Sequence, residues 1–334
     1  MVATVTQQLH AQALILGCIG NTPLHKLDVR VNERDYSIYA KFEFLNPSGS
    51  IKDRIAKYMI EEAERKNLLK PGDTIVEATS GNTGIALSMV GAAKSYKVLI
   101  VMPENMTGER IKLMTNLGAG VCLTPKADGF EGAVARAKKI ANSDRQYFLT
   151  NQFSNVDNTM THYYTTGREI MEQMGGEVDA FVAGVGTGGT LMGVGKALRE
   201  KNPGIRLVAV EPEEAAILSG HKAIGDHKIA GIGDVFIPEI VDMKSIDEVI
   251  AIKSDSAVEM AKLLSSRFGL MVGVSSGANI LASVRVLDEI GSEKRVVTVL
   301  PDRTERYFST DLYLLKEEQV RQCSRHCECP FDRL

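Results

Sequence analysis

Residues 46–54 read N-P-S-G-S-I-K-D-R, and this stretch decides how the rest of the chain is interpreted. It follows an extended apolar run, SIYAKFEF at 37–44, and precedes the segment DRIAKYMIEEAERKN at 53–67. Apolar residues recur there at helical spacing, which predicts a helix with one packed face. Lys52 therefore stands where a predicted strand gives way to a predicted helix, and open α/β sheets bind their ligands at such junctions.

Composition indicates an ordinary globular protein. The chain has 334 residues, 44% hydrophobic and 24% charged, which is enough for a large core or two domains. A net charge of -3 gives no electrostatic reason to expect nucleic acid or an anionic membrane as a partner. The first 20 residues lack the pattern of a signal peptide, and no apolar run reaches membrane-spanning length.

The cysteines indicate a reducing compartment. Their number is odd, five, and both Cys18 and Cys122 lie in apolar segments, where we expect buried, reduced thiols. We therefore expect a cytoplasmic enzyme.

Strand-like and helix-like segments alternate through the chain. The predicted strands are 73–78, 96–103, 120–125, 178–186, 205–212, 247–253 and 294–301, and the predicted helices are 82–95, 109–118, 130–142, 190–202, 255–268 and one opening near 278. This alternation predicts mostly parallel sheets with helices on both faces. We expect an α/β protein of two interlocked three-layer α/β/α domains with a cleft between them.

Two polar, glycine-containing turns lie between a predicted strand and a predicted helix: TSGNTG at 79–84 and GVGTGGT at 184–190. A third such turn, GVSSGA at 273–278, also opens a predicted helix. The first is suited to a carboxylate or phosphate, although any helix cap has a similar composition. The second lacks the lysine of a P-loop and the glycine spacing of a dinucleotide site, but its N–H groups and hydroxyls suit one phosphate group. Glu211, at the end of the next strand, keeps a nucleotide-binding dehydrogenase open as an alternative.

A lysine at a sheet edge and a cradle for a single phosphate, without an acidic cluster for Mg²⁺, indicate a phosphorylated cofactor that is held covalently. Pyridoxal phosphate fits that description. A cofactor-free binding protein on the same scaffold would lack the lysine, and Lys52 is present.

The C-terminal residues, 316–334, form a polar, cysteine-rich tail. Cys323, His326, Cys327 and Cys329 could be read as metal ligands, but a structural zinc site usually needs paired ligands on a fixed knuckle. We predict no metal.

Six motifs taken together resemble those of the cysteine synthases. To the four already quoted the chain adds N-Q-F at 151–153 and H-K-I-A-G-I-G at 227–233, in the family's order and approximate spacing, and the resemblance runs from about residue 20 to about residue 312. The cysteine synthases are O-acetylserine sulfhydrylases of the fold-type II pyridoxal phosphate class, which also holds cystathionine β-synthase and the tryptophan synthase β chain.

The resemblance implies the tryptophan synthase β-like fold. Residues 47–155 would form a smaller, mobile, substrate-binding domain, and 1–46 with 156–315 a larger cofactor-binding domain. It also implies a homodimer.

The resemblance also implies roles for individual residues. Lys52 would bond the cofactor and then move the substrate's Cα proton. The other cofactor-binding residues would be Asn82 at the ring hydroxyl, Ser275 at the pyridine nitrogen, and Gly186, Thr187, Gly188, Gly189 and Thr190 at the phosphate. The substrate would be held by Thr79, Ser80, Gly81, Asn82, Thr83, Gln152 and Gly231.

The activity implied is β-replacement on O-acetyl-L-serine. Acetate leaves, an aminoacrylate intermediate forms, and sulfide or another thiol adds to give L-cysteine or a related product.

The chain departs from the family pattern at a few positions. Asp234 stands where a small apolar residue is common; it is either a solvated loop residue or a base acting on water or a hydroxyl at Cβ. The second reading would favour a cysteine lyase, which turns L-cysteine into L-serine and hydrogen sulfide, or serine-using cystathionine synthesis. Asp302 and Arg303 replace small hydroxyl residues near the pyridine side, and His221 and Lys222 are candidates for binding a phosphate leaving group.

Overall fold

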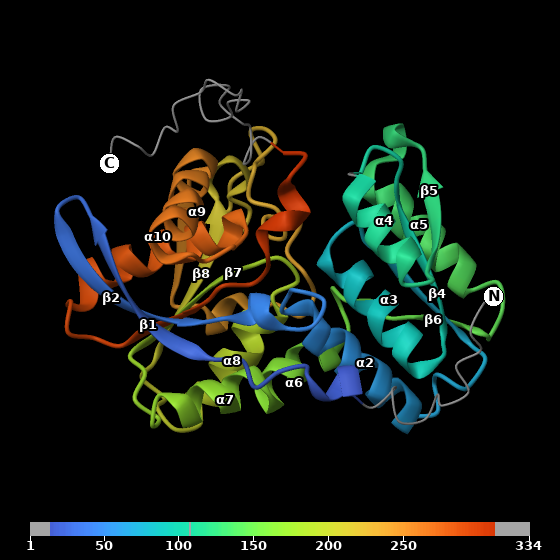
Figure 1. The fold of residues 1–334 in the computed structure, drawn as a ribbon, viewed down its shortest axis with the longest axis horizontal. Helices are drawn as coiled ribbons and strands as arrows, with labels where there is room; N and C mark the ends of the chain where they lie inside the picture. The colour runs from blue at the N-terminus through green and yellow to red at the C-terminus, as the bar shows by residue number, and fades with distance from the viewer. Residues whose placement is uncertain (1–13, 107, 311–334) are drawn as a thin grey trace, which may run out of the picture.

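The structure is a computed structural model that describes residues 14–106 and 108–310 (Figure 1). The cysteine-rich tail with its four candidate ligands lies outside these residues. Over the described ranges, no three His, Cys, Asp or Glu side chains are placed to hold a metal ion. The helices in the same ranges are all too short or too polar to cross a membrane.

The larger lobe is built on a six-stranded sheet in the order β1-β2-β10-β7-β8-β9. Its β1–β2 hairpin is antiparallel and every other pairing is parallel. The strands are β1 (Leu24–Val31), β2 (Arg34–Lys41), β7 (Ala180–Gly184), β8 (Arg206–Pro212), β9 (Glu248–Ile252) and β10 (Val296–Val299).

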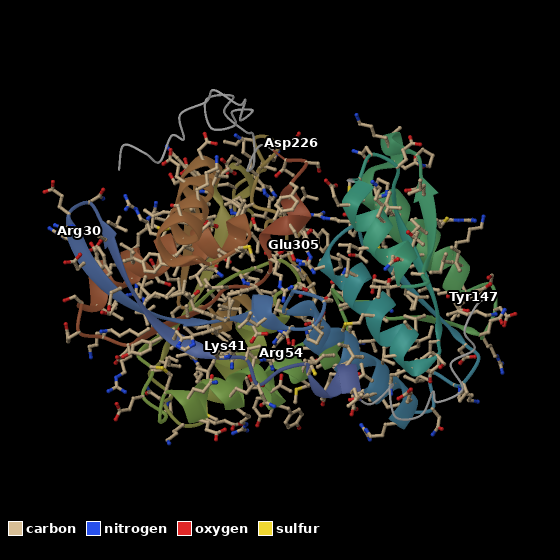
Figure 2. The ribbon with its side chains drawn as sticks, in the orientation of Figure 1. Arg30, Lys41, Arg54, Tyr147, Asp226 and Glu305 are labelled. Atoms are coloured by element: carbon tan, nitrogen blue, oxygen red, sulfur yellow. The ribbon has the colours of Figure 1, made fainter. Side chains whose placement is uncertain are left out.

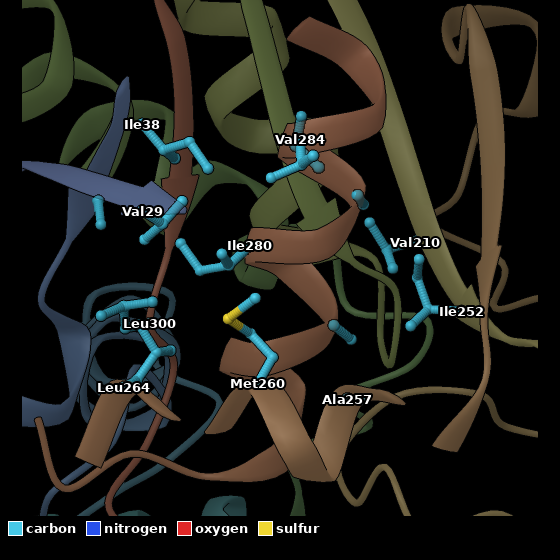
Figure 3. Close-up of a cluster of buried hydrophobic side chains, with 14 of the residues drawn as sticks. Val29, Ile38, Val210, Ile252, Ala257, Met260, Leu264, Ile280, Val284 and Leu300 are labelled. Carbon is cyan, nitrogen blue, oxygen red and sulfur yellow. The ribbon is translucent and has the colours of Figure 1, made fainter. Parts of the chain in front are cut away.

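Helices cover both faces of this sheet because its strands are apolar on both sides. Val182 of β7 packs in one core with α9 (Ser254–Phe268) and α10 (Val274–Ile290), shown in Figure 3. Its neighbour Phe181 packs in another core with α7 (Thr166–Gln173) and α8 (Gly189–Arg199). Adjacent residues of one strand thus serve opposite layers.

The smaller lobe has a four-stranded parallel sheet in the order β5-β4-β3-β6. Its strands are β3 (Thr74–Ala78), β4 (Lys97–Pro103), β5 (Gly120–Thr124) and β6 (Tyr147–Leu149). Ile75 packs toward the helices on one face, α2 (Lys52–Arg65), α3 (Asn82–Lys94) and α4 (Gly108–Asn116). Val76 packs toward α5 (Gly129–Ala141) on the other. The remaining helices are α6 (Val156–Tyr164), which packs on α8 and α2, and the 3-10 turns η1 (Glu43–Leu45), η2 (Lys126–Asp128), η3 (Glu213–Ala215), η4 (Met243–Ser245) and η5 (Thr304–Tyr307).

The predicted fold class is confirmed: each lobe has three layers and the sheets are mostly parallel. All four strands of the small sheet lie within the predicted range 47–155. The alternation did not reveal β1, the three-residue β6, or α6 and α7. The expectation that Cys18 is buried was wrong, because its short apolar segment lies on the surface and the thiol is exposed.

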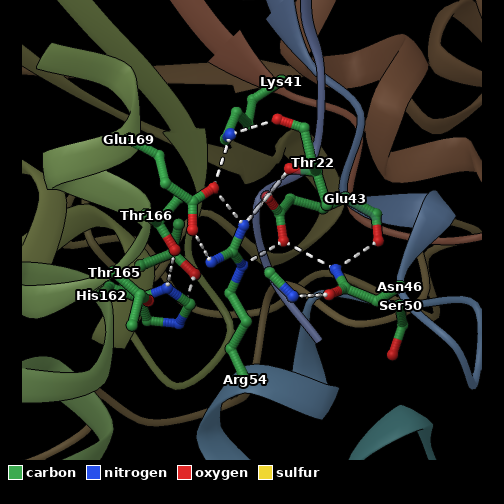
Figure 4. Close-up of polar contacts among 12 residues, drawn as sticks. Thr22, Lys41, Glu43, Asn46, Ser50, Arg54, His162, Thr165, Thr166 and Glu169 are labelled. Carbon is green, nitrogen blue, oxygen red and sulfur yellow. Dashed lines mark hydrogen bonds and ion pairs between the residues drawn. The ribbon is translucent and has the colours of Figure 1, made fainter. Parts of the chain in front are cut away.

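A buried ionic cluster joins α2 to the larger lobe (Figure 4). The Arg54 guanidinium donates from Nε to Glu43 Oε2 at 2.6 Å and from Nη1 to Glu169 Oε1 at 2.6 Å. Lys41 Nζ lies 2.7 Å from the other Glu169 oxygen. Figure 2 shows Lys41 and Arg54 in the interior, in contrast to Arg30 near the exposed hairpin turn. Two cations and two anions balance, so desolvation leaves no buried charge unpaired.

The charges of this cluster set the pKa of Glu169. Burial alone would raise it, but the hydrogen bonds and charge of Arg54, followed by those of Lys41, outweigh burial and lower the pKa to about 2. The ordinary value is 4.5. Ionised Glu169 therefore stabilises the fold above about pH 4.5, and this contribution is lost as the pH falls toward 2.

We predict that Glu169→Gln lowers the free energy of unfolding by about 3 kcal/mol at pH 7, because Arg54 and Lys41 lose their shared anion. The difference from wild type should narrow steadily below pH 4.5, where wild-type Glu169 also becomes neutral on unfolding. Urea unfolding at several pH values measures this. Glu172→Gln, an exposed position on the same helix, is the control and should show neither effect. A difference independent of pH would mean that the charge of Glu169 is not what stabilises the fold.

Candidate active site

Lys52 is the first residue of α2, and the backbone just before it is fixed to the other lobe. The Ile51 N–H donates to the Pro301 carbonyl at 2.8 Å, and Ser50 forms a β-bridge with Asp302. Burial lowers the pKa of Lys52, while the charges of Asp234 and Asp302 partly oppose the shift. A lowered pKa favours the neutral amine, the form that attacks a carbonyl and accepts a proton.

Lys52 lines a cavity of about 540 Å³ between the lobes, to which residues of both lobes contribute. A smaller cavity of about 40 Å³ continues it and also has Lys52 in its wall. The predicted site residues in the larger cavity are Lys52, Thr79, Ser80, Gly81, Asn82, Thr83, Gln152, Gly186, Thr187, Gly231 and Asp234. Those in the smaller one are Lys52, Asn82, Gly186, Thr187, Gly188, Thr190, Gly231 and Ser275. Folding thus brings together nearly the whole predicted set.

The first polar turn joins β3 to α3. Its Gly81 N–H donates to Thr79 Oγ1 at 3.2 Å, and Thr83 Oγ1 donates to Gln152 Oε1 at 2.7 Å. The second bond ties the turn to the loop after β6. Hydroxyls, an amide and the N-terminus of α3 are therefore gathered in one wall of the cavity, which suits an anionic group.

The second polar turn joins β7 to α8 and can be built only from small residues. A Cβ on Gly186 would lie 2.3 Å from the Gly231 carbonyl oxygen, and Gly188 has a positive φ of +86°. Thr187 Oγ1 accepts a bond from Asn158 Nδ2 at 3.0 Å. Gly189 is the one predicted phosphate-binding residue that lines neither cavity, because it packs against Asn158. The remaining backbone N–H groups at the start of α8 are of the kind that bind a phosphate.

The residues present fit pyridoxal phosphate on three counts. The buried Lys52 amine is available to react with the cofactor's aldehyde. The glycines of the α8 turn let a ligand come close to the main chain. Ser275 lies buried in the first turn of α10, in the wall of the smaller cavity. A lysine, a single-phosphate nest and a hydroxyl at the ends of parallel strands define an enzyme that uses this cofactor.

Comparison with known proteins agrees with the site. Residues 15–302 match the family described as "Pyridoxal-phosphate dependent enzyme". A cysteine synthase from Staphylococcus aureus (strain Mu50) is 48% identical over 296 residues, covering 88% of this chain and 95% of that protein. The structure of O-acetyl serine sulfhydrylase isoform 3 from Entamoeba histolytica is 42% identical with a TM-score of 0.85, covering 95% of this chain and 96% of that one. A hydrogen sulfide-producing enzyme from Fusobacterium nucleatum is 39% identical with a TM-score of 0.87, covering 92% and 94%.

The chain belongs to the pyridoxal phosphate-dependent enzymes, and within them to the family of the cysteine synthases.

Asp234, the residue that departs from the family pattern, lies half-buried in the wall of the cavity that holds Lys52. Burial raises the pKa of Asp234, and the charges of Lys52 and His227 oppose the rise. The nearby His227 ring bonds the Gly233 carbonyl through Nε2 at 3.1 Å. A carboxylate here is not an ordinary solvated loop residue.

Several other candidates lie outside the cavities. Glu211 is buried, and its carboxylate accepts bonds from the Leu218 and Ser219 N–H groups, so it organises its own loop instead of meeting a nucleotide. His221 and Lys222 are exposed and line neither cavity.

Sequence reasoning missed Glu77 and Arg110. Glu77 is buried at the end of β3, and its Oε2 accepts bonds from the Thr150 hydroxyl and from the Gln152 N–H at 3.1 Å. Burial raises the pKa of Glu77 to about 7, although these donors oppose it. A carboxylate inside an apolar strand was the signal that could have revealed it. Arg110, from α4, was marked by no pattern.

We predict that the cofactor is attached to Lys52. After borohydride reduction and proteolysis, mass spectrometry should find the added mass only on the peptide that contains Lys52, and Lys52→Ala should abolish it. Lys57→Ala, one turn further along the same helix, is the matched control and should keep the label. Labelling of the Lys52→Ala variant would contradict the assignment.

Proposed function

We propose that this enzyme makes L-cysteine from O-acetyl-L-serine and sulfide. The observation that carries the proposal is that Lys52, the polar turn at Thr79–Thr83 and the residues Gly186, Thr187, Gly188 and Thr190 border two cavities, which share Lys52 and Asn82 in their walls. The similarity to a cysteine synthase and to an O-acetyl serine sulfhydrylase supports it. An amino acid bound there has its carboxylate and its reacting carbons within reach of these groups.

In this proposal the chain's own groups divide the work. The hydroxyls of Thr79 and Ser80 and the amide of Gln152 hold the substrate carboxylate and orient the Cα–H bond toward Lys52. Thr83 holds the Gln152 amide in place through its hydroxyl. The Lys52 amine accepts the Cα proton and later returns it. When bound, pyridoxal phosphate supplies the electron sink that makes this proton acidic. The bond from Cβ to acetate breaks, and a bond from Cβ to sulfur forms with the incoming HS⁻.

We further propose that residues 47–155 close over the substrate. The bond between Thr83 and Gln152 joins the turn at 79–84 to the loop after β6. A substrate that contacts the turn would therefore move both segments together. Closure would exclude water from the reacting carbons.

We predict that purified enzyme loaded with pyridoxal phosphate converts O-acetyl-L-serine and sulfide to equal amounts of L-cysteine and acetate. Thr83→Val should raise KM for O-acetyl-L-serine about tenfold, since the hydrogen bond that holds the Gln152 amide against the turn is lost. Thr115→Val, on the exposed part of α4, is the control. No cysteine from O-acetyl-L-serine, with turnover of O-phospho-L-serine or L-serine instead, would overturn the choice of leaving group.

A second candidate function rests on Asp234. In this alternative the carboxylate takes a proton from water, whose oxygen then bonds Cβ, while the bond from Cβ to sulfur of L-cysteine breaks. The products are L-serine and hydrogen sulfide. The burial of Asp234 beside Lys52 favours this chemistry, and one relative is described as hydrogen sulfide-producing.

We predict that Asp234→Asn removes L-serine formation from L-cysteine by at least about a hundredfold, because no base remains for the water. Release of sulfide in the first turnover should persist. Glu239→Gln, a second carboxylate in the same exposed loop, is the control. Unchanged serine output would leave Asp234 without a catalytic role.

We also propose that the enzyme is a cytoplasmic homodimer. Tyr164 and Val156 of α6 are more than half exposed, and Tyr164 stacks on Tyr58 of α2, which together form an apolar surface suited to a second copy. Sedimentation equilibrium gives the mass; a monomer at micromolar concentration would count against the dimer.

A further inference from the structure

Asp302 lies where three parts of the site meet. Its own carbonyl accepts the Gly273 N–H at 3.0 Å, just before α10, and its backbone bridges Ser50, two residues before Lys52. The side chain is 2% exposed and is in the wall of the smaller cavity together with Ser275. None of the roles assigned above uses this carboxylate.

One oxygen of the carboxylate receives two donors. Asn82 Nδ2 lies 2.6 Å from Asp302 Oδ2, and the Tyr307 hydroxyl donates to the same atom. Oδ1 has no hydrogen-bond partner among the described residues and is packed against Gly273, where a Cβ would lie 2.2 Å from it. Two donors on Oδ2 and the close approach of Gly273 to Oδ1 hold the carboxylate in one orientation, so its bond to Asn82 has a fixed direction.

Two donors on one oxygen and two guanidinium groups stabilise the carboxylate anion against the effect of burial. Burial raises the pKa of Asp302, but the charges of Arg306 and Arg110 and the donors Tyr307 and Asn82 oppose the rise. Arg306 is held against the turn before Lys52 by its bond from Nη1 to the Gly49 carbonyl at 3.0 Å. Arg110 lies over the Tyr307 ring, 5.7 Å from its centroid.

A carboxylate anion only accepts hydrogen bonds, so the Asn82 group that meets it must be the NH₂. This fixes which end of the Asn82 amide is the donor end. One N–H is used by Asp302 and the second remains, on a residue that lines both cavities. Without Asp302 as a partner, the Asn82 amide could turn over and present its carbonyl to the cavity in place of the N–H.

We propose that Asp302 is a positioning residue that orients the Asn82 amide so that an N–H, and never the carbonyl, is presented to the cofactor's ring oxygen. The inference rests on the proposed role of Asn82. Because Asn82 opens α3 in the smaller lobe and Asp302 follows β10 in the larger, the same bond connects the two lobes through the cofactor site.

The proposal is tested by a double-mutant cycle read out on cofactor binding. The dissociation constant of pyridoxal phosphate is measured by titrating the apoenzyme, and the visible spectrum of the loaded form is recorded, for wild type, Asp302→Asn, Asn82→Ala and the double variant. Asp288→Asn is the matched control. Asp288, near the end of α10, also accepts a hydrogen bond from a tyrosine, Tyr36 of β2, and lines neither cavity.

Asp302→Asn should weaken cofactor binding about fivefold and shift the visible band. The charge-assisted hydrogen bond is lost, and an asparagine at 302 can pair with either the NH₂ or the carbonyl of Asn82. In the Asn82→Ala background the same change should have less than a twofold effect. The control should match wild type.

A fivefold effect that persists in the Asn82→Ala background would overturn the proposal, since Asp302 would then act without Asn82. If Asn82→Ala itself leaves affinity and spectrum unchanged, the assigned role of Asn82 fails, and the inference fails with it for that separate reason. Melting temperatures of the four apoproteins separate these outcomes from misfolding, because a merely structural role would lower the melting temperature equally in both backgrounds and leave the spectrum unmoved.

Discussion

The buried charge of Arg54 constrains the rest of the structure. A guanidinium without water must meet carboxylates on more than one side, and those available belong to Glu43, beside β2, and Glu169, on α7. The helix that carries Arg54 is therefore held to the larger lobe although its apolar face packs in the smaller one. On an α-helix, residues two apart point about 200° from each other. Anchoring Arg54 on one side thus aims Lys52 at the cavity on the other.

The site is assembled from the N-terminal ends of several helices. Lys52 begins α2, the turn at 79–84 leads into α3, the turn at 184–190 leads into α8 and Ser275 lies in the first turn of α10. Each helix brings unpaired N–H groups and the positive end of its dipole. The carboxylate of an amino acid and a phosphate ester are the kind of groups that such an arrangement attracts. The carboxylates of half-buried Asp234 and buried Asp302 limit how positive the space becomes.

Much of this could be predicted from the sequence, for a physical reason. Parallel strands buried on both faces leave continuous apolar runs, so β3, β4, β7 and β8 were recognisable, as were the glycine turns between them and their helices. The helices α6 and α7 were not, because α6 buries polar side chains such as Thr161 and His162 in place of an apolar stripe. The bond between Asn82 and Asp302 joins residues 220 positions apart, and no local pattern encodes such a pair. Asp234 could be singled out, but its burial beside Lys52 could not.

The place of β10 governs the order in which the chain can fold. This strand is formed by residues 296–299, yet it lies between β2 and β7 in the middle of its sheet. During synthesis the β1–β2 hairpin cannot pair with β10 until residue 299 has been made. All strands of the four-stranded sheet, in contrast, have been made by residue 149. Such long-range pairing closes slowly. A chain truncated before β10 would keep an unpaired edge on β2, and that edge would be exposed to aggregation.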